Sequence, residues 1–196
     1  MGPLVFACAL LLGTPVEWEA TTGLGGLVWE LPPEQAPGLE SANAVVWAAR
    51  RRWHRDWWIG ADLLYSAYDG REPGFVGPAF WLADAMVHRR FDLGDWVLSL
   101  GAGLAVSVFR SERILEDSVG TTPAGRYTLW MPGVHAGVHA ALLRRLHPRL
   151  LMGFSLRYYS GLNWRSCWEG PARDCGGIDH ETQHWVFGLS VVLVDP

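Results

Sequence analysis

The sequence predicts an all-β protein, an eight-stranded antiparallel up-and-down transmembrane β-barrel, and three observations lead to this prediction. The 196 residues include 23 Gly and 12 Trp but only 18% charged residues. Eight segments alternate between bulky apolar and small or polar side chains, and short and long connections alternate between them. The length fits one domain.

Composition excludes several other classes. A chain that is 49% hydrophobic with a mean hydropathy of +0.09 is too apolar for disorder. The longest uninterrupted apolar stretch, Leu4 to Gly13, is far shorter than the ~20 residues of a membrane-spanning helix. The 16 basic residues are all Arg, and against 20 acidic residues they give a net charge of −4, so no nucleic-acid partner is predicted.

Residues 1–16 are predicted to be a signal peptide, possessing the apolar core Leu4 to Leu12 but no basic start and no clean cleavage site. A signal truncated at its start would explain both absences. The alternatives are a buried first strand and a lipoprotein attachment site at Cys8. Residues 17–196 then form the barrel.

The clearest strand is predicted over Asp95 to Arg110. Its even positions carry bulky apolar side chains from Trp96 to Val108, whereas its odd positions carry mainly Gly, Ser and Ala; a helix would mix the two sets. The same alternation recurs over residues 57–66, 81–88, 130–142, 150–159 and 184–193. Two weaker segments cover 17–31, whose acids lie mostly on the odd face, and 41–51, whose inward face the pattern does not assign. Pro132 predicts a bulge or a late strand start.

The distribution of charge decides which face points inward. The bulky face carries almost no charge, and the other face is too small and polar for a dry core, which indicates a transmembrane barrel rather than a sandwich or lipocalin. We expect Leu100→Arg to be damaging and Gly101→Ser, on the inward face, to be far milder. Aromatic residues at or near the strand ends are predicted to form the lipid-facing girdles: Trp57, Tyr65, Trp81, Trp96, Trp130, Tyr158 and Trp185.

Connection lengths give an independent indication. Short turns at 51–55, 91–94 and 145–149 alternate with longer connections at 32–40, 69–78, 111–127 and 161–183. In outer-membrane barrels the short turns face the periplasm. Cys167 and Cys175 share the last long connection and are predicted to form a disulfide, which agrees with export; two free thiols are the alternative.

Together these features resemble the small outer-membrane barrels of Gram-negative bacteria, the outer-membrane protein A/X/W type, over residues 17–196 and by architecture alone. The resemblance implies location in the bacterial outer membrane, insertion by the barrel-assembly machinery, and outer-membrane lipids and lipopolysaccharide as partners. Such proteins usually end on an aromatic residue, whereas this chain ends with Asp195 and Pro196.

Inward-facing polar residues are predicted to form a lumen network, in which Arg157 pairs with Asp62, Asp84 or both. The predicted members are Asp62, Asp84, His88, His135, His139, Ser155, Arg157 and Tyr159. On a strand His135 and His139 lie about 13 Å apart and cannot share an ion, so neither a metal nor a cofactor is predicted.

Two further groups could carry chemistry. Asp179-His180-Glu181 with His184 could bind a divalent ion or serve acid–base catalysis, with a solvated loop as the alternative. Arginines near the long connections could bind lipid phosphates: Arg71, Arg110, Arg113, Arg126, Arg165 and Arg173. The others cluster at the short turns: Arg50, Arg51, Arg52, Arg55, Arg89, Arg90, Arg144, Arg145 and Arg149.

The sequence contains no recognisable nucleophile–base pair and none of the His-x-Ser-Asn pattern of lipid A deacylases. The predicted function is therefore a non-enzymatic outer-membrane barrel whose surface loops serve envelope integrity, adhesion or surface interaction. The alternatives are a lipid-modifying barrel enzyme, a channel for small apolar solutes, and a soluble lipocalin-like carrier.

Overall fold

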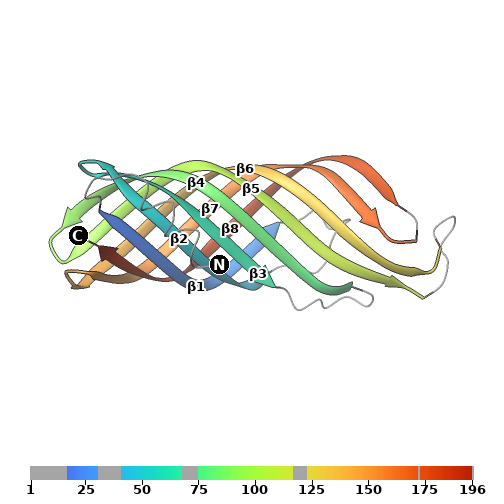
Figure 1. Ribbon diagram of the computed structural model, residues 1–196, viewed down its shortest axis with the longest axis horizontal. Coiled ribbons are helices and arrows are strands. Elements are labelled where there is room, and N and C mark those ends of the chain that lie inside the picture. Colours follow the sequence, from blue (N-terminus) through green and yellow to red (C-terminus); the bar gives the residue numbers. More distant parts are fainter. Residues whose placement is uncertain (1–16, 31–40, 68–74, 117–122, 172, 196) are drawn as a thin grey trace.

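Eight antiparallel strands close into a barrel in which each strand pairs with its sequence neighbours and β1 also pairs with β8 (Figure 1). The computed structural model describes residues 17–30, 41–67, 75–116, 123–171 and 173–195. The strands are β1 (Trp18–Glu30), β2 (Ser41–His54), β3 (Trp57–Ala67), β4 (Phe75–Leu93), β5 (Trp96–Leu115), β6 (Gly125–His147), β7 (Leu150–Glu169) and β8 (Asp174–Asp195). The predicted fold class is confirmed, whereas the predicted signal peptide lies outside the described residues.

Among the described residues, no helix is long and apolar enough to cross a membrane.

Strand β5 shows why the sequence alternates. Leu100 and Leu104 are 43% and 73% exposed on the outside of the barrel, whereas Val97 and Ser99 are 3% and 1% exposed inside it. An outer surface made of many such apolar side chains exceeds what a water-soluble protein exposes, and it is favourable only if lipid surrounds the barrel. The soluble carrier is thereby disfavoured.

The structure settles the faces of the first two strands. In β1, Glu19 and Leu27 point inward, and in β2 Val46 and Arg50 do so while Trp47 is 47% exposed outside. The prediction that Arg50 belongs to the cluster at the short turns is wrong, because the register places its side chain in the lumen, where it is 2% exposed.

The long connections contain more strand than predicted. Strand β5 continues to Leu115 and β6 starts at Gly125, so much of the predicted connection 111–127 is paired. Most of the predicted connection 161–183 is likewise β7 paired with β8. These hairpins protrude together at one end of the barrel (Figure 1). Alternation does not reveal them, since polar residues occupy both faces of a strand outside the membrane.

Two backbone features follow from the residues present. The β6–β7 pairing shifts register between Trp130 and Gly133, the bulge that Pro132 requires because it has no N–H to donate. At the β4–β5 turn Gly94 has a φ of +72°, a left-handed conformation that glycine adopts without steric cost.

Candidate functional site: the lumen and the short-turn mouth

Asp62 is the centre of an ion-pair network inside the barrel. Arg157 donates to Asp62 Oδ2 from Nε at 3.2 Å and from Nη2 at 3.0 Å, and Arg50 Nη2 donates to the same oxygen at 3.0 Å. All three side chains are 2% exposed. A carboxylate shared by two guanidiniums offsets the cost of burying each charge, which would be several kcal/mol for an unpaired ion.

The network continues in both directions along the lumen. Toward the short-turn end, Arg50 Nη1 donates to Glu19 Oε1 at 3.1 Å and Arg90 donates to Glu19 Oε2. Toward the other end, Asp84 accepts the Asp62 backbone N–H at 3.2 Å and the Tyr159 hydroxyl at 2.5 Å. The result is an alternating chain of charges: Arg90, Glu19, Arg50, Asp62 and Arg157.

Four histidines fill the next part of the lumen as two pairs. His88 and His139 approach to 3.3 Å between their Nδ1 atoms, and the rings of His135 and His184 lie 4.9 Å apart. Among the described residues, no group of three or more His, Cys, Asp or Glu side chains could hold a metal ion.

The His88 ring also corrects the expectation for Gly101. A Cβ at Gly101 would lie 2.5 Å from His88 Nδ1, closer than real Cβ atoms approach. Gly101→Ser is therefore not a mild change, because the glycine leaves the room that the imidazole occupies.

The eight predicted lumen residues all lie inside the barrel and are at most 7% exposed: Asp62, Asp84, His88, His135, His139, Ser155, Arg157 and Tyr159. Sequence reasoning missed Glu19, Arg50, Arg90 and His184. Glu19 stood on the odd, acid-bearing face of its segment, but no pattern in residues 41–51 identified Arg50 as its partner.

Two residues of the second candidate constellation, Glu181 and His184, lie on opposite faces of β8. His184 is fully buried in the lumen, whereas Glu181 is exposed on the outside, because they lie an odd number of positions apart on one strand. The side chains of Asp179 and His180 lie outside the described residues.

One hydroxyl–imidazole contact exists that the sequence did not reveal. Ser107 Oγ lies 2.7 Å from His135 Nε2, but both residues are at most 4% exposed and His135 Nδ1 has no hydrogen-bond partner among the described residues. A catalytic base needs a group that orients its second nitrogen, and a nucleophile needs access to substrate. This pair therefore fills the lumen.

Apolar side chains close the lumen toward the protruding hairpins. Phe80 on β4, Phe109 on β5 and Met131 on β6 are 1–2% exposed and face one another across consecutive strand pairs. With Leu27 and Leu129 they belong to one buried cluster. The described part of the lumen is thus a packed core, in agreement with the width of an eight-stranded barrel.

The predicted girdle residues lie on the outside of the barrel. Trp57 and Trp96 stand near the short turns, where Arg89 and Arg144 lie 5.7 Å and 6.0 Å from their rings. Toward the other end, Tyr65 contacts Trp81 and Tyr158 contacts Trp185, with centroid separations of 5.6 Å and 4.4 Å. There Arg110 also lies 5.4 Å from the Trp130 ring.

The protruding β7–β8 hairpin contains the predicted disulfide. Cys167 and Cys175 are directly opposite each other in the strand register, with 4.2 Å between their Cα atoms, and they are bonded. The predicted disulfide is confirmed.

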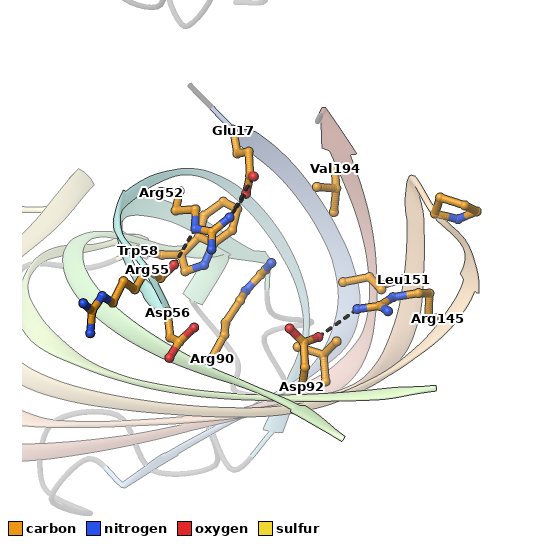
Figure 2. Close-up of a pocket in the computed structure, with 12 residues that line it drawn as sticks. Glu17, Arg52, Arg55, Asp56, Trp58, Arg90, Asp92, Arg145, Leu151 and Val194 are labelled. Carbon is orange, nitrogen blue, oxygen red and sulfur yellow. Dashed lines mark hydrogen bonds and ion pairs between the residues drawn. The ribbon is translucent and has the colours of Figure 1, made fainter. Parts of the chain in front are cut away.

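At the short-turn end, the lumen opens into a mouth of about 340 Å³ (Figure 2). Arg90 forms its floor with Trp58, over whose ring the guanidinium lies at 4.2 Å. The remaining lining residues are Glu17, Arg52, Arg55, Asp56, Asp92, Val97, Arg145, Pro148, Leu151 and Val194.

An apolar outer surface, two belts of aromatic residues and a filled polar lumen define a transmembrane β-barrel of the bacterial outer-membrane kind. Among the solved structures that share the fold are the following three. Neisserial surface protein A is 13% identical, with a TM-score of 0.58 over 90% of this chain and 96% of its own. A major outer membrane protein of Thermus thermophilus is 9% identical, with a TM-score of 0.64 over 93% and 100%.

The third is Ail, the attachment invasion locus protein of Yersinia pestis, which is 12% identical, with a TM-score of 0.52 over 92% and 100%. At these identities the similarity establishes the fold, and with the apolar outer surface it supports outer-membrane localisation. No protein-family model matches the chain, and no curated protein matches it by sequence.

Proposed function

We propose that this protein is a non-enzymatic outer-membrane barrel whose protruding hairpins serve surface interaction or adhesion. The observation that carries the proposal is the unequal height of the strands: β3 ends at Ala67, two residues after Tyr65, whereas β7 continues to Glu169, well past Tyr158. Strands that continue past the aromatic belt present side chains to the exterior without contributing to the membrane span. The fold shared with an attachment protein of Yersinia pestis supports the same class of role.

The buried interior argues against a channel for small apolar solutes. A solute would have to displace the paired charges around Asp62 and the aromatic pair Phe80 and Phe109. Breaking buried ion pairs costs several kcal/mol, which a small apolar molecule does not replace.

Contact with outer-membrane lipids belongs to the same proposal. Arg110 and Arg126 both pair with Glu112, at 2.7 Å and 2.9 Å, so two guanidiniums share one carboxylate beside the aromatic belt nearer the protruding hairpins. The excess positive charge suits lipid phosphates, which guanidiniums bind with two parallel hydrogen bonds. Insertion by the barrel-assembly machinery completes the proposed partners.

The test compares bacteria that express the full chain with bacteria that express a variant whose β7–β8 hairpin is shortened, two residues replacing 165–176. We expect both forms to reach the surface in equal amounts and only the full chain to promote cell–cell aggregation and retention on an epithelial cell layer. Equal retention of bacteria that carry either form, at matched surface amounts, would show that the hairpin does not contribute to adhesion.

A further inference from the structure

The mouth at the short-turn end is built as a ligand site. Its volume of about 340 Å³ lies at the lower end of the range for small-molecule pockets. Four arginines and three carboxylates line it, on a wall formed mainly by β2, β3 and β4 (Figure 2). Facing them are the apolar side chains Val97, Leu151 and Val194 from β5, β7 and β8. Figure 2 shows Arg145 of β6 beside Leu151, so charged side chains predominate on one side of the mouth and apolar side chains on the other.

Arg90 is the group on which the site depends. Its side chain is nine-tenths buried, its Nη2 is used by Glu19, and its plane is supported by the Trp58 ring. Its Nε is buried and has no hydrogen-bond partner among the described residues. Leaving a buried donor of a charged group unsatisfied costs more than the bond itself contributes, so an acceptor that enters the mouth and reaches this Nε–H would relieve that cost.

The charges around Arg90 bear on the sign of the acceptor that its Nε–H would take. Glu19, its only buried partner among the described residues, is shared with Arg50, which in turn shares Asp62 with Arg157. At the rim, Glu17 is occupied by Arg52 and Asp92 by Arg145, at 2.7 Å and 2.8 Å. Figure 2 shows Arg90 extending into the mouth between these two rim pairs. Asp56 is the third carboxylate of the lining, and with four arginines against three carboxylates the lining of the mouth carries one excess positive charge.

We propose that the mouth at the short-turn end binds a small organic anion, a carboxylate carried on an apolar body, with the carboxylate on Arg90 and the apolar part against Val97, Leu151 and Val194. The Nε–H of Arg90 is the donor that the ion pair with Glu19 leaves unused, and stacking on the Trp58 ring holds the guanidinium plane in place for a charge-assisted hydrogen bond. Arg55 and Asp56 also line the mouth, and because the described residues provide no ion pair for either, their opposite charges offset each other at the rim. The ligand is either a free acid or the carboxyl terminus of a peptide, since both carry the same chemistry.

The test uses the full chain folded in phosphocholine micelles, with N-acetyl-leucine as the probe and its uncharged amide as the matched comparison. Binding is followed by isothermal titration and by the NMR signals of the arginine Nε–H groups. We expect the acid to bind at least about tenfold more tightly than the amide, and the Arg90 signal to shift on titration. Equal binding of acid and amide would overturn the proposal. So would the absence of detectable binding at acid concentrations up to about 10 mM.

Variants separate the site from the general charge of the protein. Arg90→Gln and Arg52→Gln should each weaken binding of N-acetyl-leucine, the first by about tenfold or more and the second because it leaves Glu17 unpaired at the rim, whereas Arg149→Gln, an exposed arginine outside the mouth, should leave it unchanged. Arg52→Gln keeps the test decisive if Arg90→Gln does not fold, because Arg52 is exposed and takes no part in the lumen network. Equal weakening by all three variants would show unspecific attraction.

Two further probes define the ligand. Inorganic phosphate lacks an apolar body and should bind more weakly than N-acetyl-leucine. Equally tight binding would show that the apolar side chains do not contribute to affinity and would overturn the proposal. N-acetyl-Gly-Gly-Leu presents the same carboxylate on a peptide. Tighter binding than N-acetyl-leucine supports a peptide terminus as the ligand, and weaker binding supports a free acid.

Discussion

Asp62 contributes more to the stability of the barrel than either arginine that pairs with it. Asp62→Ala leaves both Arg50 and Arg157 without the carboxylate they share and should destabilise the barrel by about 3–5 kcal/mol. Arg157→Ala should cost less, about 1.5–3 kcal/mol, because Arg50 still neutralises Asp62. Urea titrations of refolding into lipid vesicles measure both free energies, with Arg149→Ala as the surface control.

The order of the two values is the decisive result. A larger cost for Arg157→Ala than for Asp62→Ala would show that Arg50 does not compensate. The double variant Asp62→Ala/Arg157→Ala should cost less than the sum of the single changes, because either change alone already breaks the pair.

A second residue-scale prediction concerns the lipid face. Leu100→Arg places a charge where the outer surface meets hydrocarbon and should cost about 2–4 kcal/mol, whereas Leu93→Arg, at the β4–β5 turn, should cost at most about 1 kcal/mol. The same refolding titrations compare them. Similar losses from both changes would contradict the position of the membrane along the barrel.

The Gly101 position shows what a single residue's pattern leaves out. Alternation predicts correctly that Gly101 points inward, but it does not reveal that His88 lies against that glycine from the neighbouring strand. Crowding depends on residues brought together by strand register, and the sequence of one strand contains no information about it.

At the scale of the elements, the β7–β8 hairpin should depend on its disulfide and the barrel should not. Cys167→Ser/Cys175→Ser removes the cross-link between two strands that already pair around it, so we expect faster cleavage of the hairpin by trypsin and an unchanged heat-modifiable gel shift. Mass mapping without reductant should find the linked peptide in the parent protein. Loss of the gel shift in the variant would mean that the hairpin is needed for barrel closure.

The strands were predictable from the sequence only where contact with lipid restricts which residues can point outward. Inside the membrane the outward positions must be apolar, which made β5 readable from Trp96 to Val108. Beyond the membrane that requirement ends, and the paired residues from Gly161 to Glu169 were interpreted as part of a loop. The face of β2 was not assigned because alanine and arginine there alternate without a consistent apolar side.

At the scale of the whole molecule, the identities of most lumen residues followed from alternation, whereas their partners did not. Arg157 was expected to meet one of two aspartates, and the structure gives it Asp62, while Asp84 accepts from Tyr159. Which aspartate Arg157 meets depends on the relative heights of β3 and β7, which lie on opposite sides of the barrel and are not paired with each other. Closure also brought Glu19 of β1 into the same network as Arg90 of β4.

The filled lumen predicts how the whole barrel behaves in a bilayer. Side chains of the ion-pair network, the two histidine pairs and the Phe80–Phe109 pair occupy the described interior, so the protein should show no currents of porin size. The variant Arg50→Ala/Arg157→Ala/Tyr159→Ala removes three of the larger interior side chains and should raise the conductance measurably if it refolds. The matched variant Ile59→Ala/Leu63→Ala/Leu156→Ala trims outward-facing side chains and should leave the conductance unchanged, because no lumen volume is gained. Large open currents from the parent protein in planar bilayers would show that the interior side chains do not close the barrel.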